Sequence, residues 1–347
     1  MKNFIKYRPE IDGLRAVAVI AVIFYHAELE VFNQSLFTGG FLGVDIFFVI
    51  SGYLISKIIL NEVRDTGRFS FLNFYKRRAK RILPMLFFVM IVSFPFVYQF
   101  VIPNFFVSYS KSIISSLFFA SNFYFWDLGI GYDQLQEIQF QPFLHTWSLS
   151  VEEQFYFVFP ITLIFLIKYF KKHLNLIIII GLFLSLLLAD WMSQAHASFN
   201  FYSLPSRGWE LLAGTLIALM EIKRKKNKKN ILNDVFPLVG IILILYSLIS
   251  FNDRMFLPSF YSLVPIVGVC MIIWFSNKND LITKLLSSKI FVGAGLISYS
   301  LYLWHYPIFI LFNESNKIYL ILLIIFLSIF SYFFIEKPFR NKSIKSN

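Results

Sequence analysis

The sequence has few of the residues on which soluble and disulfide-stabilised proteins depend. Its one cysteine, Cys270, lies in an apolar run, which excludes an intrachain disulfide and a metal site built from several cysteines. Only 15% of the residues are charged and 57% are hydrophobic, a balance that excludes an ordinary soluble domain. Metal-ligand spacings, a nucleophile elbow and a phosphate-binding glycine loop are also missing, so metal, serine-hydrolase and nucleotide-hydrolysis chemistry have no support. These absences indicate an integral membrane protein.

Apolar segments of membrane-spanning length recur along the chain. They predict an all-α helical bundle of about ten transmembrane helices in one domain, residues 1–347. The first segment resembles a signal peptide but contains Arg15 and His26 and lacks a cleavage pattern, so we expect it to be retained. The aromatic-rich connection 104–150 predicts an interfacial or re-entrant helix. The predicted spans are 13–32, 41–60, 82–103, 151–168, 174–192, 206–221, 231–251, 261–277, 290–312 and 318–335.

The distribution of positive charge predicts an orientation in the bacterial cytoplasmic (inner) membrane. The net charge is +12, but the basic residues cluster beside the spans as membrane anchors do, so nucleic acid is not a predicted partner. The strongest clusters are Arg64 to Arg81 and KRKKNKK at 223–229. With both termini in the cytoplasm, nearly all Lys and Arg lie inside. The exceptions are Lys111, Arg207, Arg254 and Lys317.

Arg15 and His26 are the first candidates for function, because ionisable residues inside spans are costly. Eleven residues separate them by roughly 16 Å along a helix but only about 20° in rotation, so both occupy one face. Arg15 at the cytoplasmic mouth could bind phosphates of coenzyme A, whose pantetheine arm would carry a thioester to His26, at or beyond the midplane. His26 could act as a general base or as a nucleophile, and a packing role is the alternative.

Two further clusters lie at opposite ends of the predicted spans. Arg78 and Arg81 share a face if the third helix begins early, where they could hold nucleotide phosphates or serve only as anchors. At the outer face, the segment from His145 to Tyr156 contains Glu152 and Glu153. Glu152 and Glu153 are both candidates for a catalytic role. Ser150 and Glu153 match a capping box, which is the alternative for Glu153, whereas Glu152 could orient His26 or contact an acceptor sugar.

Other polar residues within the spans are supporting candidates. Arg207 and Glu210, three residues apart, predict a structural ion pair more than a catalytic role. Asp45 in the second span is a secondary candidate, and His305 either supports the site or lies in the aromatic belt. No residue is predicted to bind a metal.

Several ordered motifs together resemble the acyltransferase-3 family over nearly the whole chain. They are Arg8-Pro-Glu-Ile-Asp-Gly-Leu-Arg15 followed by His26, Gly43-Val-Asp-Ile-Phe-Phe-Val-Ile-Ser-Gly-Tyr-Leu54, His145 to Tyr156, and Glu336-Lys-Pro-Phe-Arg340. The family includes O-acetyltransferases of lipopolysaccharide O-antigen, peptidoglycan and exopolysaccharide. The resemblance implies that Arg15 and His26 form the family's arginine and histidine motif, with His26 catalytic and Asp12 supporting. It also implies that Arg78 and Arg81 handle the acyl donor.

The resemblance therefore implies transfer of an acyl group, acetyl in the first instance, from cytoplasmic acetyl-CoA to a hydroxyl of a cell-envelope glycan. Members of this kind often continue into a periplasmic hydrolase-like (SGNH) domain, whereas this chain stops at Asn347. We therefore expect a stand-alone transmembrane form that either transfers directly or works with a separate periplasmic protein. The alternative from another class is a transporter of a lipid-linked glycan, in which the same polar residues would line a path.

Overall fold

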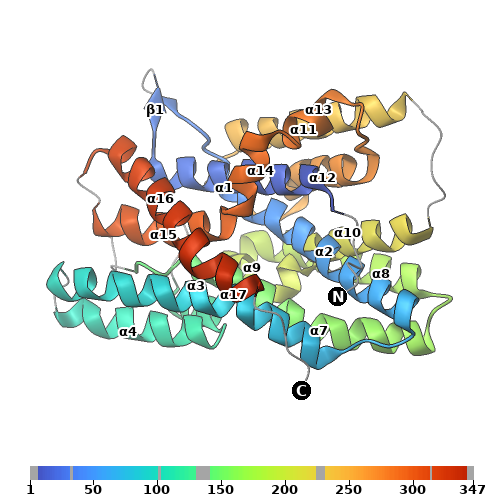
Figure 1. The fold of residues 1–347 in the computed structure, drawn as a ribbon, viewed down its shortest axis with the longest axis horizontal. Coiled ribbons are helices and arrows are strands. Elements are labelled where there is room, and N and C mark those ends of the chain that lie inside the picture. Colours follow the sequence, from blue (N-terminus) through green and yellow to red (C-terminus); the bar gives the residue numbers. More distant parts are fainter. Residues whose placement is uncertain are drawn as a thin grey trace.

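The computed structural model describes residues 7–31, 34–100, 103–129, 141–223, 231–312 and 315–341, and it is built almost entirely from helices (Figure 1). Within these ranges, strands are limited to β1 (Glu30–Val31) and β2 (Gln34–Ser35), which pair antiparallel. The predicted all-α class is confirmed. Six described helices are long and apolar enough to cross a membrane, or seven if one bent pair is a single span. The protein is therefore a multi-pass membrane protein, and the predicted number of about ten spans is not confirmed.

The helices follow one another with short connections. They are α1 (Pro9–Ala27), α2 (Gly43–Thr66), α3 (Phe71–Phe100), α4 (Pro103–Leu117), α5 (Ser121–Asp127), α7 (Thr146–Tyr169), α8 (Leu174–Ala195), α9 (Ala197–Tyr202), α10 (Leu204–Lys223), α11 (Leu232–Ser250), α12 (Leu263–Phe275), α13 (Leu281–Leu286), α14 (Lys289–Leu296), α15 (Ser298–Leu311), α16 (Lys317–Ser331) and α17 (Lys337–Asn341). Two 3₁₀ turns, Gly40–Leu42 and Phe260–Ser262, and a π-helix, Tyr332–Glu336, complete the described elements.

The helix boundaries explain why the predicted number of spans differs. α1 ends at Ala27 rather than near 32, because Glu28 adopts a left-handed conformation with φ of 49°. The predicted span 290–312 is two helices, α14 and α15, bent by 64°, and α12 has only 13 residues. The basic run KRKKNKK at 223–229 was part of the evidence for orientation. Only its first residue, which is the last residue of α10, is described by the structure. The first six and the last six residues of the chain also lie outside the described residues.

The start of α7 corrects a local prediction. The helix begins at Thr146 with His145 as its N-cap residue, so Ser150 lies one turn inside it. The predicted capping box between Ser150 and Glu153 is therefore wrong, because a residue inside the helix has no open backbone N–H group to cap. Conversely, α3 begins at Phe71, early enough to place Arg78 and Arg81 on one face.

Close helix contacts hold the centre of the bundle together. In Figure 1, α1 lies between the C-terminal helices and α2, and it packs against α2, α14 and α15. α2 packs against α10 so closely that a Cβ atom on Gly52 would lie 1.9 Å from the Leu211 carbonyl oxygen. Small residues permit such approach between membrane helices. The outer surface is apolar, as on α7, where Phe157, Ile161 and Phe165 are each more than half exposed.

Candidate functional site

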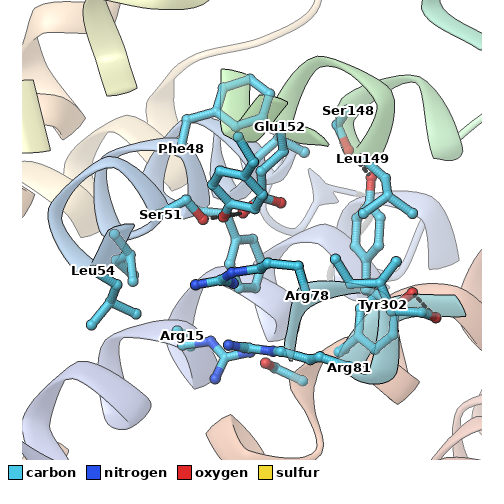
Figure 2. Close-up of a pocket in the computed structure, with 17 residues that line it drawn as sticks. Arg15, Phe48, Ser51, Leu54, Arg78, Arg81, Ser148, Leu149, Glu152 and Tyr302 are labelled. Carbon is cyan, nitrogen blue, oxygen red and sulfur yellow. Dashed lines mark hydrogen bonds between the residues drawn. The ribbon is translucent and has the colours of Figure 1, made fainter. Parts of the chain in front are cut away.

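A pocket lies among α1, α2, α3, α7 and α15 and encloses about 780 Å³, its mouth included. Its charged residues are Arg15 from α1, Arg78 and Arg81 from α3, and Glu152 from α7. Figure 2 shows the three arginines converging on one side of the pocket and Glu152 on the other. The other lining residues are Val44, Phe47, Phe48, Ile50, Ser51, Leu54, Ile82, Ser148, Leu149, Tyr156, Ser298, Tyr299 and Tyr302. The pocket thus combines an apolar wall with an excess of positive charge.

The arginines are held by different contacts. The Arg78 guanidinium lies over the Tyr156 ring, 4.8 Å from its centroid, and over Phe74 at 5.7 Å. Arg15 Nη1 donates to Asp12 Oδ1 at 3.4 Å, so Asp12 offsets part of one positive charge. Planar guanidinium groups bind phosphate oxygens through paired hydrogen bonds, and three of them suit a ligand with several phosphates. The sequence indicated each of these arginines as a candidate for phosphate binding, and their convergence is a finding of the structure.

Glu152 belongs to the pocket rather than to the immediate surroundings of His26. The hydroxyls of Ser51 and Tyr156 both donate to Glu152 Oε1, which ties α7 to α2. Glu153 is the next residue on α7, and its Oε1 is buried without a hydrogen-bond partner among the described residues. Both carboxylates lie within the electrostatic reach of Arg78. Glu152 is therefore the charge that faces the arginines.

Three histidines from three parts of the chain meet beside the pocket. His26, in the last turn of α1, lies 5.1 Å from His305 on α15, and His145 lies 5.3 Å from His305, measured between ring centroids. His26 Nδ1 donates to the Val22 carbonyl oxygen at 2.9 Å. His305 and His145 are 0% and 1% exposed, so the aromatic-belt interpretation of His305 is wrong. The sequence named each histidine but not their contact.

A pair of hydroxyls lies between these histidines and the pocket. Tyr302 on α15 donates to the His145 carbonyl oxygen at 2.7 Å, and its hydroxyl lies 2.6 Å from Ser148 Oγ. Tyr302 and Ser148 both line the pocket, as Figure 2 shows. Neither residue was predicted from the sequence, although Ser148 lies within the motif from His145 to Tyr156 and Tyr302 is three residues from His305.

A separate buried ion cluster fixes the wall behind the pocket. Arg207 Nη1 bonds to Asp45 Oδ1 at 2.8 Å and to Glu210 Oε1 at 3.2 Å, and all three side chains are at most 2% exposed. The predicted pair of Arg207 with Glu210 is present, and Asp45 joins it. The guanidinium also lies 5.4 Å from the Trp147 ring centroid, linking α2, α7 and α10. Its contacts are structural, since none of the three lines the pocket.

The C-terminal motif also reaches this region. Glu336 ends the π-helix and is 2% exposed, Ser300 Oγ donates to its Oε2 at 3.0 Å, and Arg340 lies 3.6 Å from its Oε1. Such π-helical turns are frequent at functional sites. Glu336 lies within the family-like motif Glu336 to Arg340, but no role was predicted for it from the sequence. Within the described chain, no group of three or more metal-binding side chains is arranged to hold an ion.

Comparison with known proteins agrees with this arrangement. The family described as "Acyltransferase domain" matches residues 8–335. The chain is 32% identical over 360 residues to O-acetyltransferase OatA of Staphylococcus aureus (strain NCTC 8325 / PS 47), covering 98% of this chain and 58% of that protein. It is 31% identical over 376 residues to SACOL0978 of S. aureus (strain COL), provisionally named an O-acetyltransferase, covering 99% of this chain and 60% of that protein.

The chain thus spans about three fifths of the length of these curated relatives. No solved structure matches it. The family match includes Arg15, His26, the α3 arginines, the histidine cluster and nearly all of the π-helix. Because the match extends over almost the whole chain, the protein belongs to the acyltransferase-3 family of membrane acyltransferase domains.

Proposed function

We propose that the protein is a membrane O-acyltransferase that moves an acetyl group from cytoplasmic acetyl-CoA to a hydroxyl of a cell-envelope glycan. The observation that carries the proposal is the pocket in which Arg15 of α1 meets Arg78 and Arg81 of α3. His26 lies in the last turn of the same helix as Arg15. The relatives' names, O-acetyltransferase, support acetyl as the group and oxygen as the acceptor atom. The protein would lie in the inner membrane with both ends of the chain in the cytoplasm.

In this proposal, the arginines bind the phosphates of the donor, and the apolar wall accommodates its uncharged pantetheine arm. Positive charge aimed at a polyphosphate fixes the donor in position, so that its thioester can be held in one place for the transfer. Glu152 is held opposite the arginines by its bonds to Ser51 and to Tyr156, the residue over whose ring Arg78 lies. Glu152 and Glu153 together limit the excess of positive charge when the pocket is empty.

His26 is the proposed catalytic group. An imidazole accepts a proton at ordinary pH, so His26 can activate the acceptor hydroxyl, or it can itself carry the acyl group. Its bond to the Val22 carbonyl oxygen through Nδ1 directs Nε2 away from its own helix. The acceptor glycan approaches from the His26 end of α1, and a separate periplasmic protein would receive the acyl group if direct transfer does not occur.

The test uses purified protein in liposomes with acetyl-CoA labelled in the acetyl group and a glycan acceptor. We expect label on the glycan with the wild type and a loss of at least about 100-fold in rate with His26→Ala, the range for removing a general base. Protein abundance in the membrane should be unchanged, and His173→Ala, an exposed histidine outside the site, serves as the control. Full activity of His26→Ala would refute the assignment, and glycan movement without label would indicate a transporter.

A further inference from the structure

The end of α1 carries a carboxylate close to the proposed catalytic histidine, and its interpretation rests on the acyl-transfer function proposed above. His26 lies in the last turn of α1, and Glu28 is the residue at which the helix ends. Glu28 is exposed and His26 is partly exposed, whereas most residues of α1 are buried. An acceptor that reaches His26 from this end of the helix therefore arrives beside Glu28.

Glu28 has a backbone conformation that other residue types adopt more easily. Its φ of 49° and ψ of 43° are left-handed, and its N–H donates to the Tyr25 carbonyl oxygen at 3.2 Å, which closes the helix. Glycine or asparagine usually takes this position, because most side chains at positive φ cost free energy. Residues held in such conformations gather at active sites and ligand clamps. The backbone therefore does not explain a glutamate here, and its carboxylate is the part to be explained.

Two tyrosine rings border His26 at this end of α1. The Tyr25 ring meets the imidazole edge-on at 5.1 Å between centroids, and the Tyr306 ring from α15 does so at the same distance. The charge of Glu28 acts on Tyr306, so the carboxylate lies within electrostatic reach of this ring. A few polar groups set among aromatic rings are typical of sites for small organic ligands. Glu28 thus belongs to the surroundings of His26.

The chemistry of a carboxylate at this position fits a sugar that carries no acid group. An ionised carboxylate only accepts hydrogen bonds, so it binds groups that donate them, and every free sugar hydroxyl can donate. Glu28 can accept from a hydroxyl next to the reacting one, while His26 interacts with the reacting hydroxyl itself. A uronic acid at this place would bring a second negative charge against Glu28, and like charges repel.

We propose that Glu28 binds the acceptor sugar through a hydroxyl adjacent to the reacting one, and that it selects uncharged sugars over acidic ones. Glu28 holds the sugar and takes no part in the bonds that form and break. Its removal should therefore weaken binding of the acceptor and leave binding of the donor unchanged, because Glu28 is not among the residues that line the arginine pocket.

The test is Glu28→Gln in the liposome assay, with oligomers of N-acetylglucosamine as the uncharged acceptor and uronic-acid oligomers as the acidic one. The wild type should label the uncharged acceptor faster. In the variant, KM for this acceptor should rise about 10-fold, since a hydrogen bond to a neutral group is weaker than one to a charged group, while kcat and KM for acetyl-CoA stay unchanged. The preference for the uncharged acceptor should fall by a similar factor. Asp127→Asn, an exposed carboxylate at the end of α5, is the matched control.

Glu28→Gly separates the role of the carboxylate from that of the backbone. Glycine adopts the left-handed conformation easily, so Tm in detergent should be unchanged or higher, while KM for the uncharged acceptor rises at least as much as in Glu28→Gln. A wild-type KM in Glu28→Gly would limit Glu28 to ending the helix and would overturn the proposal. Transfer by the wild type with an equal preference in Glu28→Gln would also overturn it and leave the proposed function standing. Absence of label on either acceptor with the wild type would overturn the proposed function, and the acceptor site with it.

Discussion

Arg15, Arg78 and Arg81 come from two helices, and their neighbours at the pocket differ. Arg15 forms an ion pair with Asp12, and Arg78 lies over the Tyr156 and Phe74 rings. Neither Arg78 nor Arg81 forms an ion pair among the described residues, and of the two Arg81 also lies over no aromatic ring there. A guanidinium that is not engaged by a carboxylate is the one most available to an anionic ligand. Arg81 is therefore the best position at which to test which part of the donor the pocket binds.

Arg81→Gln should weaken binding of acetyl-CoA but not of S-acetylpantetheine, which lacks the nucleotide phosphates. A hydrogen bond to a charged group contributes about 1.5–3 kcal/mol, so KM for acetyl-CoA should rise about 10- to 100-fold. The comparison of KM values for the two donors is the measurement. Arg64→Gln is the control, because Arg64 is exposed and pairs with Asp65 away from the pocket. An equal rise for both donors would show that Arg81 does not recognise the phosphates.

Residues on one helix were easier to predict than residues that meet across helices. The spacing of Arg15 and His26, and that of Arg78 and Arg81, follows from helical geometry, so the sequence indicated which of them share a face. Tyr302 and Ser148 are 154 positions apart, and a tyrosine among 18 tyrosines gives no periodic signal. The same reason explains why the contact among His26, His145 and His305 was not predicted.

At the scale of elements, the contact between α2 and α10 supports the pocket wall. A Cβ atom on Gly214 would lie 2.0 Å from the Val49 carbonyl oxygen, and the same holds for Gly52 against Leu211 at 1.9 Å. Ser51, which bonds to Glu152, is the neighbour of Gly52 on α2. Separation of these two helices would thus move a residue that orients the pocket carboxylate.

Gly52→Ala should lower stability by about 1–3 kcal/mol, the usual cost of overpacking, because the helices must move apart. Thermal unfolding in detergent measures this as a lower Tm. Gly293→Ala on α14 is the control, since a Cβ atom there would meet no atom within 4 Å, and it should leave Tm unchanged or raise it. Equal Tm values for the two variants would contradict the close packing of α2 on α10.

The existence of the helices was predictable, but their number as membrane spans was not. Apolar runs identify helices through composition. α1 and α10 carry charged residues, and these helices are held in the bundle by buried groups that pair with those charges. Arg8 at the start of α1, for example, bonds to Glu10 at 2.6 Å and to the Tyr53 hydroxyl at 2.9 Å. The bend between α14 and α15 and the early start of α7 depend on packing that a hydropathy pattern does not contain.

At the scale of the whole molecule, the positions of Arg15 and His26 predict that the two substrates are used from different sides of the membrane. Arg15 lies in the first half of α1 and His26 in its last turn, so donor and acceptor should be used from opposite faces of the membrane. In liposomes with a single protein orientation, we expect transfer only when acetyl-CoA is on the Arg15 face and the glycan is on the other. Labelled glycan recovered from each compartment measures this. Equal transfer with both substrates on one face would contradict it.

The hydrogen bond between Tyr302 and Ser148 has a consequence for the cell as well as for the reaction. An enzyme that took its substrates from both sides of the membrane through one open channel would let ions leak and would dissipate the electrochemical gradient across that membrane. The bond between these two hydroxyls joins α15 to α7 at the pocket wall, and a wall closed in this way would limit such a leak. A variant that removes this hydrogen bond, such as Tyr302→Ala, would make the membrane more permeable to ions, and the cell would lose energy through that leak.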